Sequence, residues 1–353
     1  KQLVLSFFAI LCLLACSGTA GTKNAGTPPP VTAANLQGYP LTLPAGGFVI
    51  LVTTNHTAPL AVTGGDWWHD AVVYQIFTKA FAGGKLPTER LDYLARTGFT
   101  AVWTTPIFAS PSPHGYDTTD YRTVDPSFGG MPAWDDYRKK ADSLGIRLVL
   151  DLVLNHTGSG HPWFRDAERN RNNKRDWYIW SKERPAGWMR PWGGGSPGSV
   201  WHWSHAAESH FYGAFWSGMP DLNYRNPAVT REAVAIGRHW LGSGAAGFRF
   251  DAARYLIEDG PHPAQADTRA TRTWWKDYHR TLGKEFYSVG EVWVNDLTKV
   301  ASYYDGGSSL RQVFDFSFYS ALIRTLQTGN PDWLRNHILA LKQSGAPLSF
   351  FAP

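Results

Sequence analysis

The strongest constraint on the fold is a repeated alternation of strand-like and helix-like segments that starts at Asp66. Runs rich in β-branched and aromatic residues predict seven strands, at residues 72–78, 100–106, 147–153, 247–252, 287–293, 312–318 and 348–351. Amphipathic segments predict helices at residues 87–96, 133–144, 229–241, 268–282 and 331–343. Such alternation builds a parallel sheet, and seven strands favour an α/β fold of the (β/α)8 TIM-barrel type. A doubly wound alternative lacks its glycine-rich turn after the first strand.

One long segment interrupts the alternation, between the third and fourth predicted strands. Residues 160–223 show little periodicity and hold eight of the 17 tryptophans. A segment this long within a compact domain is usually functional or a small inserted domain. We therefore predict an insertion after the third strand, in which some tryptophans contact a ligand and the others pack. The eight are Trp163, Trp177, Trp180, Trp188, Trp192, Trp201, Trp203 and Trp216.

The first residues resemble an export signal. Lys1 precedes an apolar run, residues 3–15, that is too short to span a bilayer and fits the core of a secretory signal. Residues 13–16, Leu-Leu-Ala-Cys, resemble a bacterial lipobox, which implies cleavage before Cys16 and a lipid on its sulfur. We expect an exported lipoprotein of the bacterial cell envelope, anchored to the membrane through Cys16. A secreted protein with an ordinary signal peptide is the alternative.

The composition excludes several classes of protein. Apolar residues make up 43% of the chain and charged residues 18%, so it can bury a sizeable core. The only cysteines are Cys12 and Cys16, which excludes a disulfide scaffold and a cysteine-based metal cluster. The net charge of +5 is dispersed, without a run of five basic residues, so no nucleic-acid partner is expected.

Acidic residues stand at the carboxyl ends of three consecutive predicted strands, at Asp151, Asp251 and Glu291. Alone, such an Asp is often a helix cap or an ion-pair partner, but in a parallel barrel catalytic groups lie at this end of the strands. Arg249 is in phase with Asp251, and a neighbouring guanidinium keeps a carboxyl ionised, as a nucleophile requires. Glu291 stands among apolar and aromatic residues, which raise a carboxyl pKa and suit a general acid. Glycoside hydrolysis needs such a pair.

Three motifs resemble sequence regions of the α-amylase family, glycoside hydrolase family 13. They are Asp-Leu-Val-Leu-Asn-His at 151–156, Gly-Phe-Arg-Phe-Asp at 247–251 and Gly-Glu-Val-Trp at 290–293. Residues 114–117 resemble the family's sugar-stacking loop. Met-Pro-Asp-Leu-Asn at 219–223 resembles a fifth region in the form found between oligo-1,6-glucosidases and neopullulanases, a group that includes lipoprotein α-amylases. The resemblance covers roughly residues 66–353.

The resemblance implies a role for each acidic residue of the matched motifs. Asp251 would be the nucleophile that forms a covalent glycosyl-enzyme. Glu291 would protonate the leaving oxygen and then activate water. Arg249 would orient Asp251 and stabilise its charge, and Asp151 would be structural, holding Arg249. A retaining outcome requires the two catalytic carboxyls to lie about 5–5.5 Å apart.

The resemblance also implies contacts to substrate and a metal ligand. His156 would donate to a hydroxyl of the sugar at the cleavage subsite, Tyr116 would stack under that sugar, and His114 would hydrogen-bond near it. Arg254 falls where the family contacts sugars on the leaving-group side. Asn155 matches a calcium ligand of many amylases, so calcium is the one cofactor that the resemblance suggests.

The family's fourth region, Phe-x-x-Asn-His-Asp, is absent, although residues 350–353 resemble its opening. Because its Asp is the family's third acid, we expect a C-terminally truncated barrel with impaired activity. Pro113 stands where exo-acting relatives have an Asp, which favours an open cleft and endo-attack on the α-1,4 bonds of starch and maltodextrins. A neopullulanase, α-glucosidase, transglycosylase or non-catalytic glucan-binding homologue remains an alternative.

Together these features divide the chain into five predicted parts. They are a lipoprotein-type signal peptide at 1–16, a linker and N-terminal segment at 17–65, the first part of the catalytic barrel at 66–154, an inserted domain B at 155–224 and the second part of the barrel at 225–353.

Overall fold

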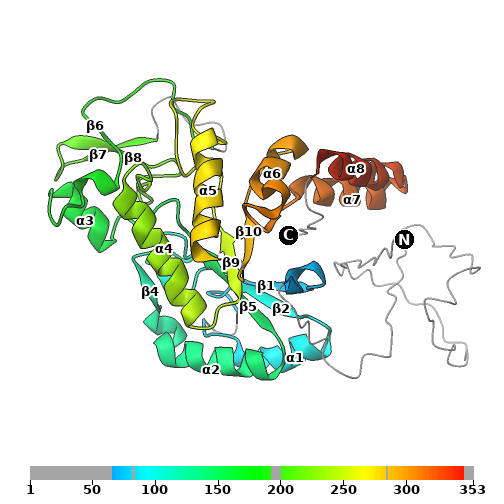
Figure 1. Ribbon diagram of the computed structural model, residues 1–353. Coiled ribbons are helices and arrows are strands. Elements are labelled where there is room, and N and C mark those ends of the chain that lie inside the picture. The colour runs from blue at the N-terminus through cyan, green and yellow to red at the C-terminus, as the bar shows by residue number, and fades with distance from the viewer. Residues whose placement is uncertain (1–65, 82–83, 192–199, 284, 346–353) are drawn as a thin grey trace, which may run out of the picture.

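A six-stranded parallel sheet forms the centre of the computed structural model, which describes residues 66–81, 84–191, 200–283 and 285–345. The strands follow one another in the order β1-β2-β5-β9-β10-β11, and each adjacent pair is parallel. The chain therefore has an α/β fold with part of a barrel, as predicted (Figure 1). The strands are β1 Val73–Ile76, β2 Ala101–Thr104, β5 Arg147–Leu152, β9 Gly247–Phe250, β10 Tyr287–Gly290 and β11 Gln312–Val313.

Helices follow most of these strands and cover the sheet. Figure 1 shows α2, α4 and α5 along one side of the sheet, and α7 and α8 as a pair after β11. All five predicted helices are present, within a few residues of their expected ends. The helices are α1 Leu91–Arg96, α2 Gly130–Ser143, α3 Pro162–Glu168, α4 Pro227–Gly242, α5 Arg269–Leu282, α6 Leu297–Tyr304, α7 Phe316–Thr328 and α8 Asp332–Ser344.

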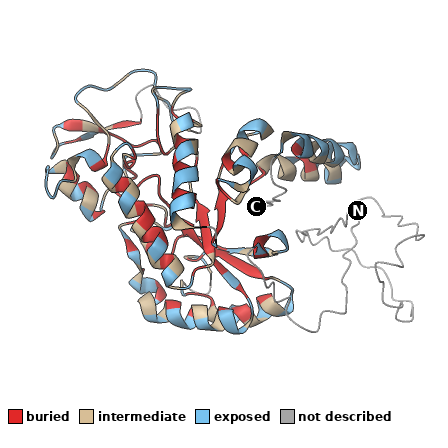
Figure 2. Cartoon of the chain, viewed as in Figure 1, coloured by how far each residue is buried: buried red, intermediate tan, exposed pale blue. Residues whose placement is uncertain are grey.

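The core lies between the sheet and these helices. Strands β2, β9 and β10 are buried along their whole length, as expected for strands with both faces covered. Phe250 of β9 packs against Trp275 of α5, with ring centroids 4.6 Å apart. Figure 2 shows this burial in the strands, whereas α7 and α8 bury one residue each, Ala321 and Leu341.

The predicted strand at residues 312–318 is wrong beyond Val313. Residues Phe316–Thr328 form α7, and the Asp315 side chain caps that helix by accepting a hydrogen bond from the Phe318 amide. The aromatic run suggested a strand, but an N-cap followed by a packed helix overrides that preference. The predicted strand at 348–351 lies outside the described residues.

Two small antiparallel sheets interrupt the barrel pattern. Strand β3 Phe108–Ala109 pairs with β4 Asp120–Val124. A second sheet has the order β6-β8-β7 and consists of Trp180–Ser181, Ser209–Tyr212 and Trp201–Ser204. The second sheet and α3 fall within the predicted insertion at 155–224, although the boundaries of the five predicted parts stay a prediction.

The predicted signal peptide, the predicted linker and Cys16 lie outside the described residues. Among the helices that the structure describes, none is both long enough and apolar enough to cross a membrane.

Replacing Gly247 with alanine is expected to destabilise the centre of the sheet. A Cβ at this position would lie 2.1 Å from the carbonyl oxygen of Tyr287 in β10, so the two strands would have to separate. We expect a loss of about 1–3 kcal/mol in the free energy of unfolding, measured by urea denaturation. Gly242→Ala at the end of α4 is the matched control, because its added Cβ would approach no other part of the described structure within 4 Å. Equal stability of the two variants would contradict this account.

Candidate active site

The carboxyl ends of β5, β9 and β10 bring together four of the predicted site residues. Asp151 of β5 pairs in register with Arg249 of β9, and Asp251 and Glu291 directly follow β9 and β10. The Nη1 atom of Arg249 lies 2.8 Å from Asp151 Oδ1 and 2.7 Å from Asp251 Oδ1. Its Nη2 atom lies 3.0 Å from Glu291 Oε2. One guanidinium therefore contacts three carboxyl groups.

These four side chains differ in exposure, so only some of them can contact a molecule from solvent. Asp151 and Arg249 are buried, whereas the side chains of Asp251 and Glu291 are 13% and 24% exposed. Asp151 Oδ2 also accepts hydrogen bonds from Trp103 Nε1 and from the Tyr116 hydroxyl, each at 3.2 Å. Asp151 therefore binds Arg249 on the buried side of the network, and the other two carboxyls are partly exposed to solvent.

Burial raises the pKa of two of the three carboxyls. It raises the pKa of Asp151 to about 7, against the opposing effect of Arg249. Burial also raises the pKa of Glu291, with further increases from the Asp251 charge and a hydrogen bond to Asp251. This is the direction expected for Glu291 from its apolar sequence surroundings. A protonated Glu291 relieves the excess negative charge around one guanidinium.

A cavity of about 420 Å³ opens above this cluster. The His114 and Tyr116 rings stack on one another on its wall, 6.0 Å apart at 25°. Trp216 and Trp293 are 44% and 57% exposed at its edge. A second cavity of the same volume is lined by Arg147, the first residue of β5, so it belongs to the opposite end of the strands. The first cavity is lined by His114, Tyr116, His156, Phe215, Trp216, Met219, Arg249, Asp251, Ala252, Arg254, Tyr255, Glu291 and Trp293.

His156 lies on the wall of the same cavity and carries a buried, unpartnered Nε2 atom. Its Nδ1 atom lies 2.9 Å from Asn155 Oδ1, and Asn155 Nδ2 donates to the Tyr255 carbonyl at 2.7 Å. Burial lowers the pKa of His156 to about 4, so the imidazole is neutral near pH 7. The structure thus places this imidazole on the cavity wall, where the resemblance expects it to contact a sugar hydroxyl.

Arg254 lines the cavity, but the structure directs its N–H groups elsewhere. Its Nε and Nη2 atoms bind the Asp267 carboxylate at 2.9 and 2.5 Å, and Nη1 donates to the Trp293 carbonyl at 2.7 Å. The sequence predicts Arg254 as a site residue but gives no sign of Asp267, which belongs to no recognised motif. Trp103, Phe215 and Met219 were also missed, although residues 219–223 had been recognised as a motif.

Asn155 lies beside an unpaired carboxylate oxygen, which bears on the calcium prediction. Asp221 is buried, its Oδ1 accepts from the Ala214 amide at 2.9 Å, and its Oδ2 has no partner. Burial raises the pKa of Asp221, and the neighbouring Asn155 side chain opposes that shift. The Asn155 NH₂ group itself donates to the Tyr255 carbonyl. No cluster of three His, Cys, Asp or Glu that could bind a metal occurs in the described part of the chain.

Paired carboxyls at the carboxyl edge of a parallel barrel sheet, next to an arginine and aromatic rings, are an arrangement typical of glycoside hydrolases. Residues 78–346 match the model of the alpha-amylase family, described as the alpha amylase catalytic domain. The chain belongs to this family.

The chain is similar to proteins that are named for different activities. It is 37% identical over 252 residues to alpha-amylase 3 of Dictyoglomus thermophilum, covering 68% of this chain and 46% of the relative. It is 38% identical over 209 residues to a probable alpha-glucosidase of Rhizobium meliloti, covering 55% and 37%. The crystal structure of an alpha-amylase from H. orenii superposes with a TM-score of 0.68 at 34% identity, covering 78% of this chain and 57% of the other. The chain thus spans less than half the length of these two curated relatives.

Replacing Arg249 with methionine is expected to destabilise the fold in a pH-dependent way. Removing the cation leaves the buried Asp151 and the partly buried Asp251 and Glu291 carboxyls without a positive partner, at a cost of about 3–5 kcal/mol. Carboxyl pKa values in the folded state then rise further above their unfolded values, so the folded state binds more protons and its stability falls as pH rises through about 4–8. Urea denaturation at pH 5 and pH 8 measures this, and the loss should be larger at pH 8.

The matched control is Arg122→Met, because the Arg122–Glu232 pair is exposed. We expect it to cost less than about 1 kcal/mol at either pH. An Arg249→Met loss that is the same at both pH values would contradict the electrostatic account of the cluster.

Proposed function

We propose that this protein is a retaining glycoside hydrolase that cleaves α-1,4-glucosidic bonds of starch and related α-glucans by endo-attack. The observation that carries the proposal is the simultaneous contact of Arg249 with Asp251 and Glu291 on the floor of an open cavity. Two carboxyls that contact one guanidinium lie near one another. This supports the short separation of a retaining enzyme, about 5–5.5 Å, over the wider one that admits a water between the carboxyls.

In the proposed reaction Asp251 is the nucleophile and Glu291 the acid. A carboxylate oxygen of Asp251 attacks the anomeric carbon while Glu291 gives its proton to the departing glycosidic oxygen, which leaves a glycosyl ester on Asp251. Glu291 then removes a proton from water, and the resulting hydroxide attacks the same carbon and frees Asp251. Arg249 orients Asp251, and Tyr116 provides a ring under the reacting sugar. The pKa of Glu291 is raised by burial, which favours the protonated form that the first step needs.

The preference for polymeric substrate is supported by the walls of the cavity. Trp216 and Trp293 expose ring surface at its edge, and such rings stack against sugars. Pro113 stands where exo-acting relatives have an Asp. The similar proteins named alpha-amylase agree with this reading. The similarity to a probable alpha-glucosidase makes that the second candidate, and the products released from starch, pullulan and maltose distinguish the two.

Replacing either carboxyl of the pair should remove activity in distinguishable ways. For the full-length gene product, we expect Glu291→Gln to lower kcat on maltooligosaccharides by about 10²–10⁴-fold, because the leaving oxygen is no longer protonated. An aryl glycoside with an acidic phenol needs little protonation, so its cleavage should be much less affected.

Asp251→Asn should abolish turnover of both substrates. It should also abolish covalent labelling by a fluorinated glycosyl fluoride, which mass spectrometry detects on the Asp251 peptide of the unmodified protein. Labelling of another residue would refute the assignment of the nucleophile.

We further propose that calcium binds Asn155, Asp221 and the Tyr255 carbonyl. The buried, unpartnered Asp221 oxygen supports this, because an uncompensated buried carboxylate is costly. Calcium bound there would join the loop after β9 to the inserted segment. For this role the Asn155 amide turns its oxygen to the ion and its NH₂ group to His156, which makes Nε2 of that ring a donor.

Calcium should therefore stabilise the protein in a way that depends on Asp221. We expect millimolar calcium, added after chelation, to raise the thermal midpoint of unfolding by several degrees, and Asp221→Asn to remove that response. Asp120→Asn, which removes an exposed carboxylate from β4, is the control and should leave the response intact. A calcium response that survives Asp221→Asn would place the ion elsewhere.

The proposed location is the bacterial cell envelope, with a lipid anchor on Cys16 and a secreted form as the alternative. The support is the sequence of residues 1–30 alone: the short apolar run, the lipobox-like end and the tether.

A further inference from the structure

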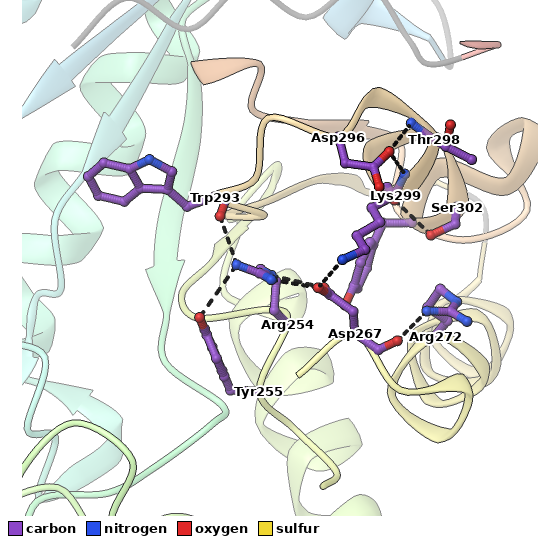
Figure 3. Close-up of polar contacts among 10 residues, drawn as sticks. Arg254, Tyr255, Asp267, Arg272, Trp293, Asp296, Thr298, Lys299 and Ser302 are labelled. Carbon is purple, nitrogen blue, oxygen red and sulfur yellow. Dashed lines mark hydrogen bonds and ion pairs between the residues drawn. The ribbon is translucent and has the colours of Figure 1, made fainter. Parts of the chain in front are cut away.

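We infer that Asp267 is a positioning residue for the general acid, acting through Arg254 and the backbone of the loop that carries Glu291. The inference rests on the proposed function of Glu291. Asp267 is far from any recognised motif and does not line the cavity. Its carboxylate nevertheless organises the contacts that fix the segment immediately after β10, as Figure 3 shows.

Asp267 and Arg254 close the loop between β9 and α5. The Asp267 amide donates to the Arg254 carbonyl at 3.0 Å, and its carboxylate binds the same residue's guanidinium through Nε and Nη2. The Asp267 side chain is only 9% exposed and also accepts a hydrogen bond from the Tyr303 hydroxyl at 2.9 Å, while Lys299 Nζ lies 3.8 Å away. The hydrogen bonds from Arg254 hold the pKa of Asp267 below its usual value despite burial. This carboxylate is therefore a fixed anion.

The Arg254 guanidinium, held by Asp267, in turn binds the backbone of the loop after β10. Arg254 Nη1 donates to the Trp293 carbonyl at 2.7 Å and lies 3.5 Å from the Tyr255 hydroxyl. In Figure 3 the Trp293 ring points away from Arg254 and its carbonyl points toward it. Trp293 is two residues after Glu291, whose own amide donates to the Phe250 carbonyl at 2.9 Å. Glu291 is thus held at its backbone by β9 and, two residues later, by the arginine that Asp267 orients.

This arrangement changes the role expected for Arg254. The resemblance implied a contact with sugars on the leaving-group side, but all three guanidinium nitrogens have protein partners. A bidentate contact to Asp267 leaves the planar guanidinium only one orientation, which a lysine could not reproduce. Arg254 therefore serves to fix the Trp293 carbonyl before substrate arrives. Such advance positioning matters because a displacement of about 1 Å at a catalytic group can cost about 100-fold in rate.

The test compares two substrates that differ in their need for an acid. Using the full-length protein, kcat and KM are measured for a maltooligosaccharide and for an aryl maltooligosaccharide with an acidic phenol as leaving group. Asp267→Asn keeps the side-chain shape and tolerates the left-handed backbone at this residue, where φ is +57°. We expect it to lower kcat on the maltooligosaccharide by about 10–100-fold and on the aryl substrate by no more than about threefold.

Two further variants separate positioning from folding and from substrate binding. Arg254→Lys should give a smaller loss with the same substrate dependence and an unchanged KM, whereas a substrate-binding Arg254 would raise KM. Lys299→Gln is the control, because Lys299 faces the same carboxylate but does not contact Trp293; it should behave as the unmodified protein on both substrates. If Asp267→Asn does not fold, the kcat and KM of Arg254→Lys on the two substrates test the positioning role instead.

An equal loss of kcat on both substrates in Asp267→Asn would overturn the inference, since Asp267 would then have only a structural role. An unchanged kcat on both substrates would also overturn it. Glu291→Gln, assayed alongside, tests the proposed function separately. If it does not discriminate between the two substrates, Glu291 is not the acid, and the positioning role fails with it. If Glu291→Gln discriminates and Asp267→Asn does not, only the positioning role fails.

Discussion

The contact of Arg249 with three carboxyl groups is the interaction on which the site depends. A buried guanidinium needs anionic partners, and a buried carboxylate needs a cation, so neither Arg249 nor Asp151 could occupy its position alone. Three carboxyls exceed what one cation neutralises. The excess is relieved where burial raises the pKa, which includes Glu291. The same crowding of carboxyls that Arg249 stabilises therefore also favours the protonated form of Glu291.

The sheet provides this contact because it fixes register. Asp151 and Arg249 are directly opposite one another on β5 and β9, so their side chains leave the same face at the same height. The close approach of β10 requires Gly247, where a Cβ would collide with Tyr287. Glu291 then follows β10 at the level where Asp251 follows β9. The pair of carboxyls is therefore a consequence of strand pairing, and the loops only refine it.

This explains which features the sequence could predict. The acids at strand ends and the phase of Arg249 with Asp251 follow from periodicity, and the family resemblance supplied Tyr116, His114 and His156. The helix α7 was missed because its aromatic start has strand propensity, and only the Asp315 cap and packing against α8 decide otherwise. Asp267 was missed for a different reason. Its importance comes from a contact with Arg254, thirteen residues away in the chain, and no local pattern encodes such a contact.

The aromatic side chains at the edge of the cavity are supported by other elements than the charged residues on its floor. The ring of Trp293 stacks on Phe316 of α7, with centroids 4.9 Å apart at 13°. That helix is joined to α8 by a 2.6 Å contact between Asp315 and His337. On the other wall, Trp216 belongs to the inserted segment. Both exposed tryptophans at the edge of the cavity are thus attached to parts of the chain outside β5 and β9, while the arginine-centred network lies at the ends of the strands. Under the proposed function, substitutions in the walls could change which glucan fits without disturbing that network.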